Sequence, residues 1–131
     1  MNTKPATGRL EDRPEDFALR NIKPGMPAVW EDGVRLTHRN PGAYEWWYMD
    51  GHFSNGMMLV VTFFTYVGVD GTLMPRVNIN ISNADGVIVD QELDFASKDL
   101  TAAETHAYVN VKSSYFRGVD GLNAYEIHVA P

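Results

Sequence analysis

The sequence predicts an all-β protein whose antiparallel strands curve into a barrel or a sandwich. Short runs rich in β-branched and aromatic residues recur along the chain, Gly-containing turns separate them, and no helical pattern is longer than one or two turns. A closed barrel needs about eight strands, whereas the pattern indicates only about six or seven. We therefore expect a barrel that is incomplete within these 131 residues.

The first 29 residues differ in composition from the rest of the chain. Residues 1–29 contain four of the seven prolines and alternate acidic with basic side chains, so they cannot bury enough apolar area to order on their own. They predict a flexible arm, laid across the domain by Phe17 and Leu19. Residues 30–131 then form the β domain, in which Trp30-Glu31-Asp32-Gly33 and Arg39-Asn40-Pro41-Gly42 are turn-rich segments before the first strand.

The first strand, Tyr44 to Phe53, turns at Asn55-Gly56 into the apolar run Met57 to Phe64. Asn-Gly favours a two-residue type I′ hairpin loop. In that register one face carries, on the first strand, Trp46, Tyr48 and Asp50 and, on the second, Val61, Phe63 and Thr65. Because both faces of this hairpin are largely apolar, we expect one to line a ligand cavity and the other to pack on protein.

The later segments follow the same logic. Arg76 to Ser82 alternates apolar with polar residues and predicts a half-buried strand. A three-residue loop with Gly86 in the left-handed conformation aligns Ile81 with Val89, whereas a two-residue loop would set Ile81 against Asp90. Residues 98–104 can form one helical turn, and residues 108–112 and 124–129 are further strands.

Composition excludes several function classes. A net charge of −6 with scattered basic residues argues against nucleic acid as a partner. With no cysteine there is no disulfide, thiolate nucleophile or Cys-based zinc site, and no histidine pair has the i, i+4 spacing of a helical zinc site. We therefore expect neither a metal nor a cofactor. The longest apolar run is too short to span a membrane and no signal-peptide core is present, which leaves the compartment open with a slight preference for the cytoplasm.

Several motifs, in order, resemble the carotenoid 1,2-hydratase family, also called AttH-like. They are Trp30-Glu31-Asp32-Gly33, Glu45-Trp46-Trp47-Tyr48-x-Asp50-Gly51-His52, the Asn55-Gly56 hairpin, the strand around Ile79, and Phe116-x-Gly118 before Tyr125-Glu126-Ile127-His128-Val129. The similarity covers residues 28–130. The Glu-Trp-Trp-Tyr string is the most specific part, because two adjacent Trp between a Glu and a Tyr are rare.

The resemblance implies an antiparallel lipocalin-like β-barrel, of which this chain matches only the N-terminal part of the first of two barrels. It implies a cofactor-free enzyme that encloses a polyene, terpenoid or polyketide and catalyses proton-initiated hydration or cyclisation. The remaining half of such a protein, or a second polypeptide, is then an expected partner beside the hydrophobic substrate. Two alternatives stay open: a non-catalytic carrier of hydrophobic molecules, and a scaffold half whose chemistry lies elsewhere.

Hydration of an unactivated alkene needs a positioned acid and aromatic faces that stabilise a carbocation. In the predicted register Asp50 and Tyr48 are the candidate catalytic residues, and Trp46, Val61, Phe63 and Thr65 line the ligand cavity. The alternative is that Asp50 caps the backbone at Gly51. Trp47 points to the opposite face and is expected to contact protein.

Overall fold

The computed structural model describes residues 8–130, which form two antiparallel four-stranded sheets. The long sheet contains, in spatial order, β1 (Tyr44–His52), β2 (Met58–Val67), β3 (Leu73–Asn83) and β4 (Gly86–Asp94). The short sheet contains β5 (Leu100–Ala102), β6 (Tyr108–Val111), β7 (Ser114–Asp120) and β8 (Ala124–His128). The all-β prediction is confirmed. Two strands were not recognised from the pattern: β5, which has only three residues, and β7, which lies in the segment between the predicted strands 108–112 and 124–129.

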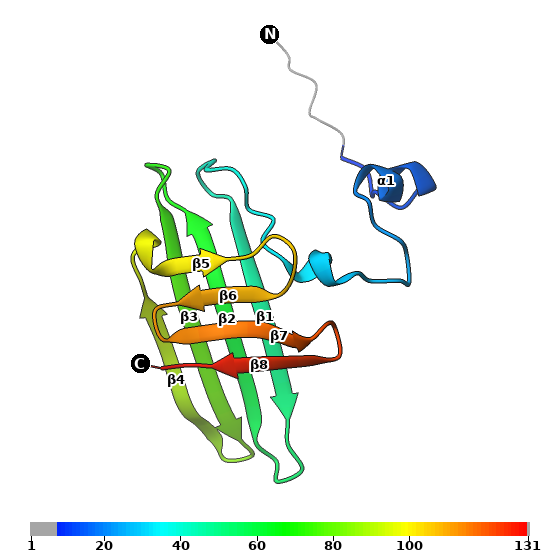
Figure 1. Cartoon of the computed structure of the whole chain (residues 1–131). Coiled ribbons are helices and arrows are strands. Elements are labelled where there is room, and N and C mark those ends of the chain that lie inside the picture. Colours follow the sequence, from blue (N-terminus) through cyan, green and yellow to red (C-terminus); the bar gives the residue numbers. More distant parts are fainter. Residues whose placement is uncertain (1–7, 131) are drawn as a thin grey trace.

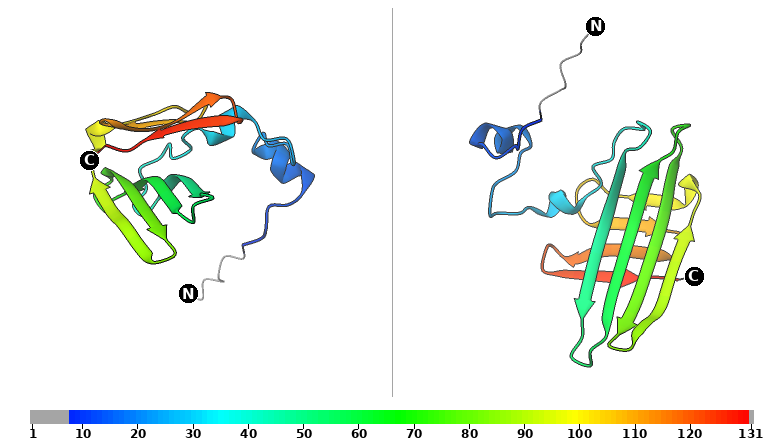
Figure 2. Two further views of the ribbon diagram at one scale, coloured as in Figure 1. Left: turned by 90° about the horizontal axis from the view of Figure 1, so that it is seen from below. Right: turned by 180° about the vertical axis from the view of Figure 1, so that it is seen from behind.

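The two sheets are separate layers, and neither closes into a barrel (Figures 1 and 2). The strands of the short sheet run crosswise over those of the long sheet (Figure 1). This arrangement is a crossed packing of two sheets, in which side chains from the facing surfaces form the core. Both sheets therefore keep two edge strands: β1 and β4 in the long sheet, β5 and β8 in the short sheet.

The core lies between the two sheets. We call the side of the long sheet that faces the short sheet its inner face; it carries Trp47, Val61, Phe63 and Val77, all of which are buried. Val109, Val111 and Phe116 pack against them from the short sheet, and the rings of Phe63 and Phe116 meet edge to face at 6.3 Å. The opposite, outer face of the long sheet carries Trp46 and Tyr48, whose side chains are about half exposed.

The register of the first hairpin differs from the prediction by one residue. Trp46 pairs with Phe64 and Tyr48 with Thr62, not with Thr65 and Phe63. The loop contains three residues, 54–56, because Phe53 N–H donates to the Met57 carbonyl at 2.8 Å and Gly56 adopts a φ of +82°. A slip of one residue moves every side chain of the partner strand to the other face. The predicted grouping of six residues on one face is therefore wrong.

The register of the second hairpin is confirmed, although its turn is different. Ile81 pairs with Val89 as predicted. The connecting loop, however, has two residues, 84–85, and a β-bulge beside Ile81 and Ser82 supplies the extra residue. Gly86 has the expected positive φ, at +131°. The alternation of apolar side chains thus selected the correct pairing, because it must keep Ile81 on the buried side.

The arm contains a short helix, α1 (Pro14–Leu19), and leads into the 3-10 turn η1 (Val29–Asp32). In Figures 1 and 2, α1 stands apart from both sheets. Leu19 is 79% exposed, so the prediction that it holds the arm across the domain is wrong. Phe17 instead borders a hollow formed by other arm residues, including Pro14 and Ile22. Of residues 98–104, predicted to form one helical turn, only the first two belong to the 3-10 turn η2 (Ser97–Asp99), and residues 100–102 instead form β5.

No helix within residues 8–130 is long and apolar enough to cross a membrane.

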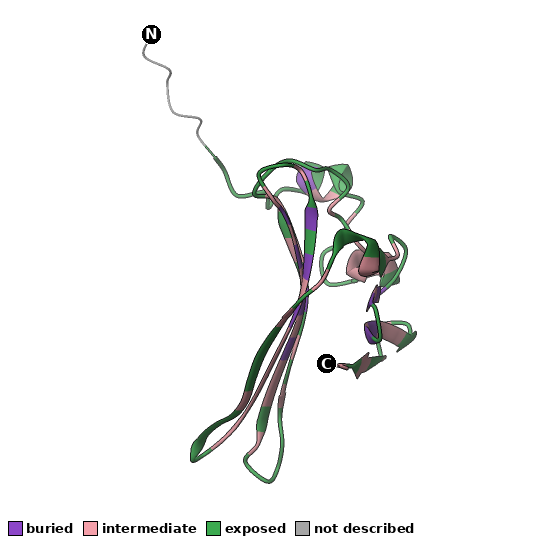
Figure 3. Ribbon diagram, turned by 90° about the vertical axis from the view of Figure 1, so that its left-hand side faces the viewer, coloured by how far each residue is buried: buried purple, intermediate pink, exposed green. Residues whose placement is uncertain are grey.

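The long sheet extends beyond the short one, and both of its hairpin tips project past β8 (Figures 1 and 3). Only part of its inner face is therefore covered.

Candidate functional site

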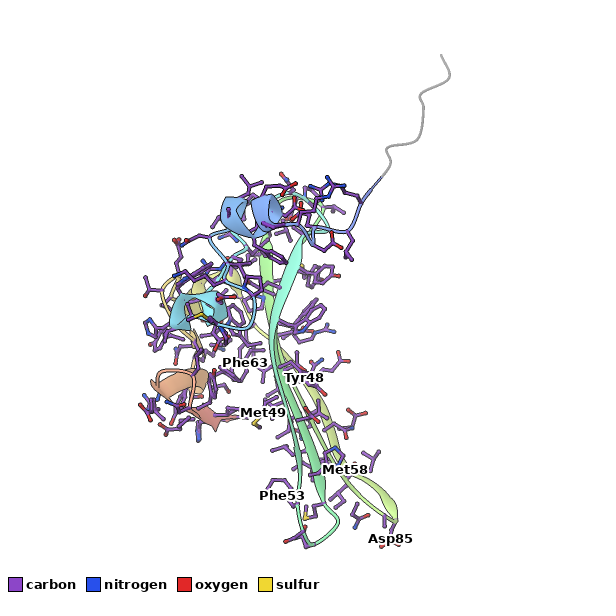
Figure 4. The ribbon with its side chains drawn as sticks, turned by 90° about the vertical axis from the view of Figure 1, so that its right-hand side faces the viewer. Tyr48, Met49, Phe53, Met58, Phe63 and Asp85 are labelled. Atoms are coloured by element: carbon purple, nitrogen blue, oxygen red, sulfur yellow. The ribbon has the colours of Figure 1, made fainter. Side chains whose placement is uncertain are left out.

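The six residues predicted to form one site lie on two faces of the long sheet. Figure 4 shows Phe63 and Met49 on the side of the short sheet and Tyr48 on the other side. By the strand pairing, Trp46, Tyr48 and Asp50 share the outer face, whereas Val61, Phe63 and Thr65 share the buried inner face. Val61 and Phe63 are 2% and 1% exposed and belong to the core between the sheets. The structure therefore brings together each group of three but not the six.

Asp50 lies in a polar setting rather than in an apolar cavity. Its carboxylate is 3.7 Å from Nε2 of His52, and both side chains are more than half exposed. The apolar neighbours that sequence reasoning assigned to it, Val61 and Phe63, are on the opposite face. Asp50 therefore lacks the apolar surroundings on which its prediction as a catalytic acid rested.

A cleft of about 390 Å³ opens between the edge strand β1 and the far end of the short sheet. Residues from η1, β1, β7 and β8 line it: Asp32, Trp46, Trp47, Tyr48, Met49, Phe116 and Tyr125. Most of this lining is aromatic or apolar, and the aromatic side chains offer π-faces to a bound molecule. Two of the predicted site residues, Trp46 and Tyr48, belong to this lining. Although they stand on the outer face, they border the cleft because β1 is the edge strand of the long sheet.

One hydrogen-bonded pair supplies the charge in the cleft. The hydroxyl of Tyr125 donates to Oδ2 of Asp32 at 2.6 Å. This hydrogen bond, together with partial burial and the nearby carboxylate charge, raises the pKa of Tyr125 to about 12. The phenol therefore holds its proton tightly and acts as a hydrogen-bond donor. The Asp32 carboxylate has further lone pairs that can accept a hydrogen bond from a ligand hydroxyl or stabilise a positive charge.

The Glu-Trp-Trp string holds the Asp32 segment in place. Nε1 of Trp47 donates to the main-chain carbonyl of Asp32 at 2.9 Å. Glu45 accepts hydrogen bonds from the main-chain N–H groups of Arg35 and Leu36 at 2.7 and 3.0 Å. Both contacts attach residues 32–36 to the edge of β1. The most distinctive motif of the sequence thus has an identifiable structural role, which is to position the carboxylate of the cleft.

Sequence reasoning did not identify Asp32, Tyr125 or Phe116 as site residues. Asp32 and Tyr125 are 93 positions apart in the chain, and their contact depends on how the two sheets cross. The available signal was indirect: both belong to segments that carried the family resemblance, Trp30-Glu31-Asp32-Gly33 and the strand that begins before Tyr125.

Within the described part of the chain, no group of three or more His, Asp or Glu side chains is arranged to hold a metal ion. Comparisons of the chain with protein-family models, with curated proteins and with solved structures found no match.

The Asp32–Tyr125 pair predicts a specific loss of stability in alkali. Because folding raises the pKa of Tyr125 from 10.0 to about 12, this contribution is fully present below pH 10 and is lost as the pH rises from about 10 to about 12. Tyr125 is 40% exposed, so after allowance for solvent screening we expect a contribution of about 1 kcal/mol. Urea unfolding at pH 9 to 12 should show a shallower decline for Tyr125→Phe than for the wild type. Asp32→Asn should behave alike, and a wild-type slope in both variants would contradict the pair's role.

Proposed function

We propose that this chain binds a hydrophobic small molecule in the cleft between β1 and β8, the one that is lined by Asp32, Trp47 and Tyr125. The observation that carries the proposal is the composition of the cleft, in which Trp47, Met49 and Phe116 surround one carboxylate–phenol pair. Apolar walls with a few convergent polar groups are the usual features of small-molecule sites. A ligand with an apolar body and one hydroxyl or polarised end matches them.

We further propose that binding serves a cofactor-free reaction on a polyene, terpenoid or polyketide, as the resemblance to the carotenoid 1,2-hydratase family suggests. The indole and phenyl faces would hold a polyene in a folded shape, and together with the Asp32 carboxylate they would stabilise partial positive charge in the transition state. Of the two reaction types, cyclisation agrees better with the cleft than hydration does. The reason is that a pericyclic cyclisation exchanges π bonds for C–C σ bonds without a proton donor, whereas hydration and cation-initiated cyclisation both need a strong acid, and a pKa of about 12 makes Tyr125 a weak one.

A non-catalytic carrier is the second candidate. The specific observation that favours it is the same raised pKa of Tyr125, which makes this phenol a poor proton donor. The exposed position of Asp50 beside His52 points in the same direction.

Ligand binding is testable with the neutral probe N-phenyl-1-naphthylamine, followed by its fluorescence and by quenching of tryptophan emission. Met49→Lys places a hydrated ammonium group in the cleft, from which an apolar probe would have to displace water. It should therefore raise the Kd for the probe at least about tenfold, which is about 1.4 kcal/mol of binding free energy. Met74→Lys is the matched control, because Met74 is 42% exposed and lies on the outer face of β3. Its Kd should stay within about twofold. Equal effects of the two substitutions, or no saturable binding, would refute the site.

The reaction is tested by incubating the chain in H₂¹⁸O with squalene, whose isolated double bonds can be hydrated, and separately with cis-parinaric acid, a linear conjugated tetraene that can close by a pericyclic route. The products are analysed by mass spectrometry. Hydration adds one labelled water across a double bond, with the proton on one carbon and the ¹⁸O hydroxyl on the other. Cyclisation gives an isomer of unchanged mass and fewer double bonds. Recovery of both substrates unchanged from a chain that does bind them would reject the enzyme proposal and favour the carrier.

A further inference from the structure

Part of the inner face of the long sheet continues beyond the core without a covering layer. Leu59, Ile81 and Val89 pair in one row across β2, β3 and β4, next to the row of Val61 and Ile79. All three are half-buried, and Leu59 at the near end of the row also packs against the core. Figure 3 shows these hairpin ends projecting past the short sheet. A hollow of about 270 Å³ lies beside this row at the tip of the first hairpin, and Met58 reaches it from the outer face. It is bordered mainly by apolar side chains: Phe53, Asn55, Met57, Met58, Leu59 and Ile81. We call the row of Leu59, Ile81 and Val89 the uncovered inner face.

The strand beside the uncovered inner face, β8, is an open edge. The main-chain N–H of Gly118 donates to the Ala107 carbonyl at 2.8 Å, so the backbone groups of Gly118 point away from β8. Gly118 pairs with Tyr125 and Phe116 with Ile127. Because backbone groups alternate in direction along an antiparallel strand, the N–H and C=O groups of Tyr125 and Ile127 point to the free edge. Such a row is a template for another strand.

A strand added to β8 would lie over the uncovered inner face. Since the short sheet runs crosswise (Figure 1), an added strand would cross β2, β3 and β4 in turn. Leu59, Ile81 and Val89 form one row across these three strands on the inner face. Four strands spaced by about 4.8 Å span about 14 Å, which an extended chain crosses in about five residues. Alternate side chains of that strand would point toward the apolar row, into the space that opens where the long sheet bends away from the short sheet (Figure 3).

The occupant cannot be a second copy paired through its own β8. Antiparallel pairing of two identical edges requires a two-fold axis perpendicular to the sheet, which keeps both long sheets on the same side. Because each long sheet projects past β8, the projecting tips of the two copies would occupy the same space (Figures 1 and 3). The site therefore fits a single-layer segment, which is a lone strand.

We propose that the β8 edge and the uncovered inner face form a docking site for an extended strand of a separate polypeptide. The strand has apolar residues at alternate positions and at least five residues in the sheet. A neutral or basic segment suits the chain's net charge of −6. Main-chain hydrogen bonds to Tyr125 and Ile127 supply affinity, and the apolar row supplies specificity for the alternating pattern.

The test uses a synthetic peptide with an alternating pattern taken from this chain, the sequence of residues 76–83, capped at both ends. It is basic, and its Val and two Ile alternate with polar residues. We expect saturable binding by fluorescence anisotropy and at least about tenfold slower hydrogen exchange at the amides of Tyr125 and Ile127. A peptide of the same composition with Val and both Ile adjacent should bind at least about tenfold more weakly. Equal binding of both peptides, or no binding of either, would overturn the proposal.

Two pairs of variants locate the site. Leu59→Lys should weaken the alternating peptide at least about tenfold, whereas Val60→Lys, on the outer face one residue away, should leave its Kd within about twofold. Ile127→Pro removes an N–H from the free edge without breaking the β7–β8 ladder, so it should fold and lose peptide binding. If peptide binding survives in both Leu59→Lys and Ile127→Pro, the site is wrong. Slow exchange of the same amides that depends on protein concentration alone would assign the edge to a second copy and overturn our choice of occupant.

Discussion

Replacing Trp47 by Ala should destabilise the protein by about 3 to 5 kcal/mol, the usual cost of removing a large aromatic side chain from a core. Trp47 is 7% exposed, belongs to the core between the sheets, and donates its indole N–H to the Asp32 carbonyl. The substitution therefore leaves a void and an unpaired carbonyl. Urea unfolding followed by circular dichroism measures the loss.

Trp46→Ala is the matched control, because the two tryptophans are adjacent and differ in face. Trp46 is 53% exposed and stacks on Tyr44 with ring centroids 5.3 Å apart. An exposed aromatic stack is worth about 0.5 to 1.5 kcal/mol, so the expected loss is about 1 kcal/mol. Trp47→Phe, which keeps much of the volume and removes the N–H, should fall between the two. Equal losses at positions 46 and 47 would contradict the assignment of faces.

Gly33→Ala should cost about 3 kcal/mol, at the upper end of the range for overpacking. A Cβ at position 33 would overlap the main-chain carbonyl of Glu104, which is backbone and cannot rotate away. Val34 N–H donates to the Ala103 carbonyl at 2.8 Å directly beside it, so relief of the overlap would break this hydrogen bond. The same movement would draw Asp32 away from Tyr125. We therefore expect weaker binding of N-phenyl-1-naphthylamine in addition to lower stability.

Gly56→Ala separates the effect of close packing from the ordinary cost of replacing a glycine. Gly56 has a φ of +82° and open space where a Cβ would stand, so its substitution should cost about 1 to 2 kcal/mol with no change in probe binding. Thermal unfolding of both variants, with titration of the probe, makes the comparison. A loss at Gly33 no larger than that at Gly56 would show that the segment moves away without cost.

The first hairpin shows how far local pattern can be trusted. The positions of both strands follow from alternating apolar residues and from Asn55-Gly56. The same signals do not decide whether Ser54 belongs to the strand or to the loop. Asn-Gly suits a two-residue loop, and Gly also suits the last position of a three-residue loop. Because both faces carry apolar residues, the apolar pattern could not distinguish the two registers. At the second hairpin, the wrong register would have set the polar Asp90 and Glu92 against the half-buried Ile81 and Ile79, and the predicted register was correct.

By itself, the sequence determined the all-β class, the places where strands turn, and the burial of Trp47, because period-two alternation and turn chemistry are local properties. Only the tertiary structure decided which of these strands face each other across the core. The crossing of the two sheets brings Asp32 to Tyr125 over 93 positions and leaves β8 open beside an apolar surface. Such contacts depend on how long each sheet is and where it crosses the other, and no local pattern of residues encodes that geometry.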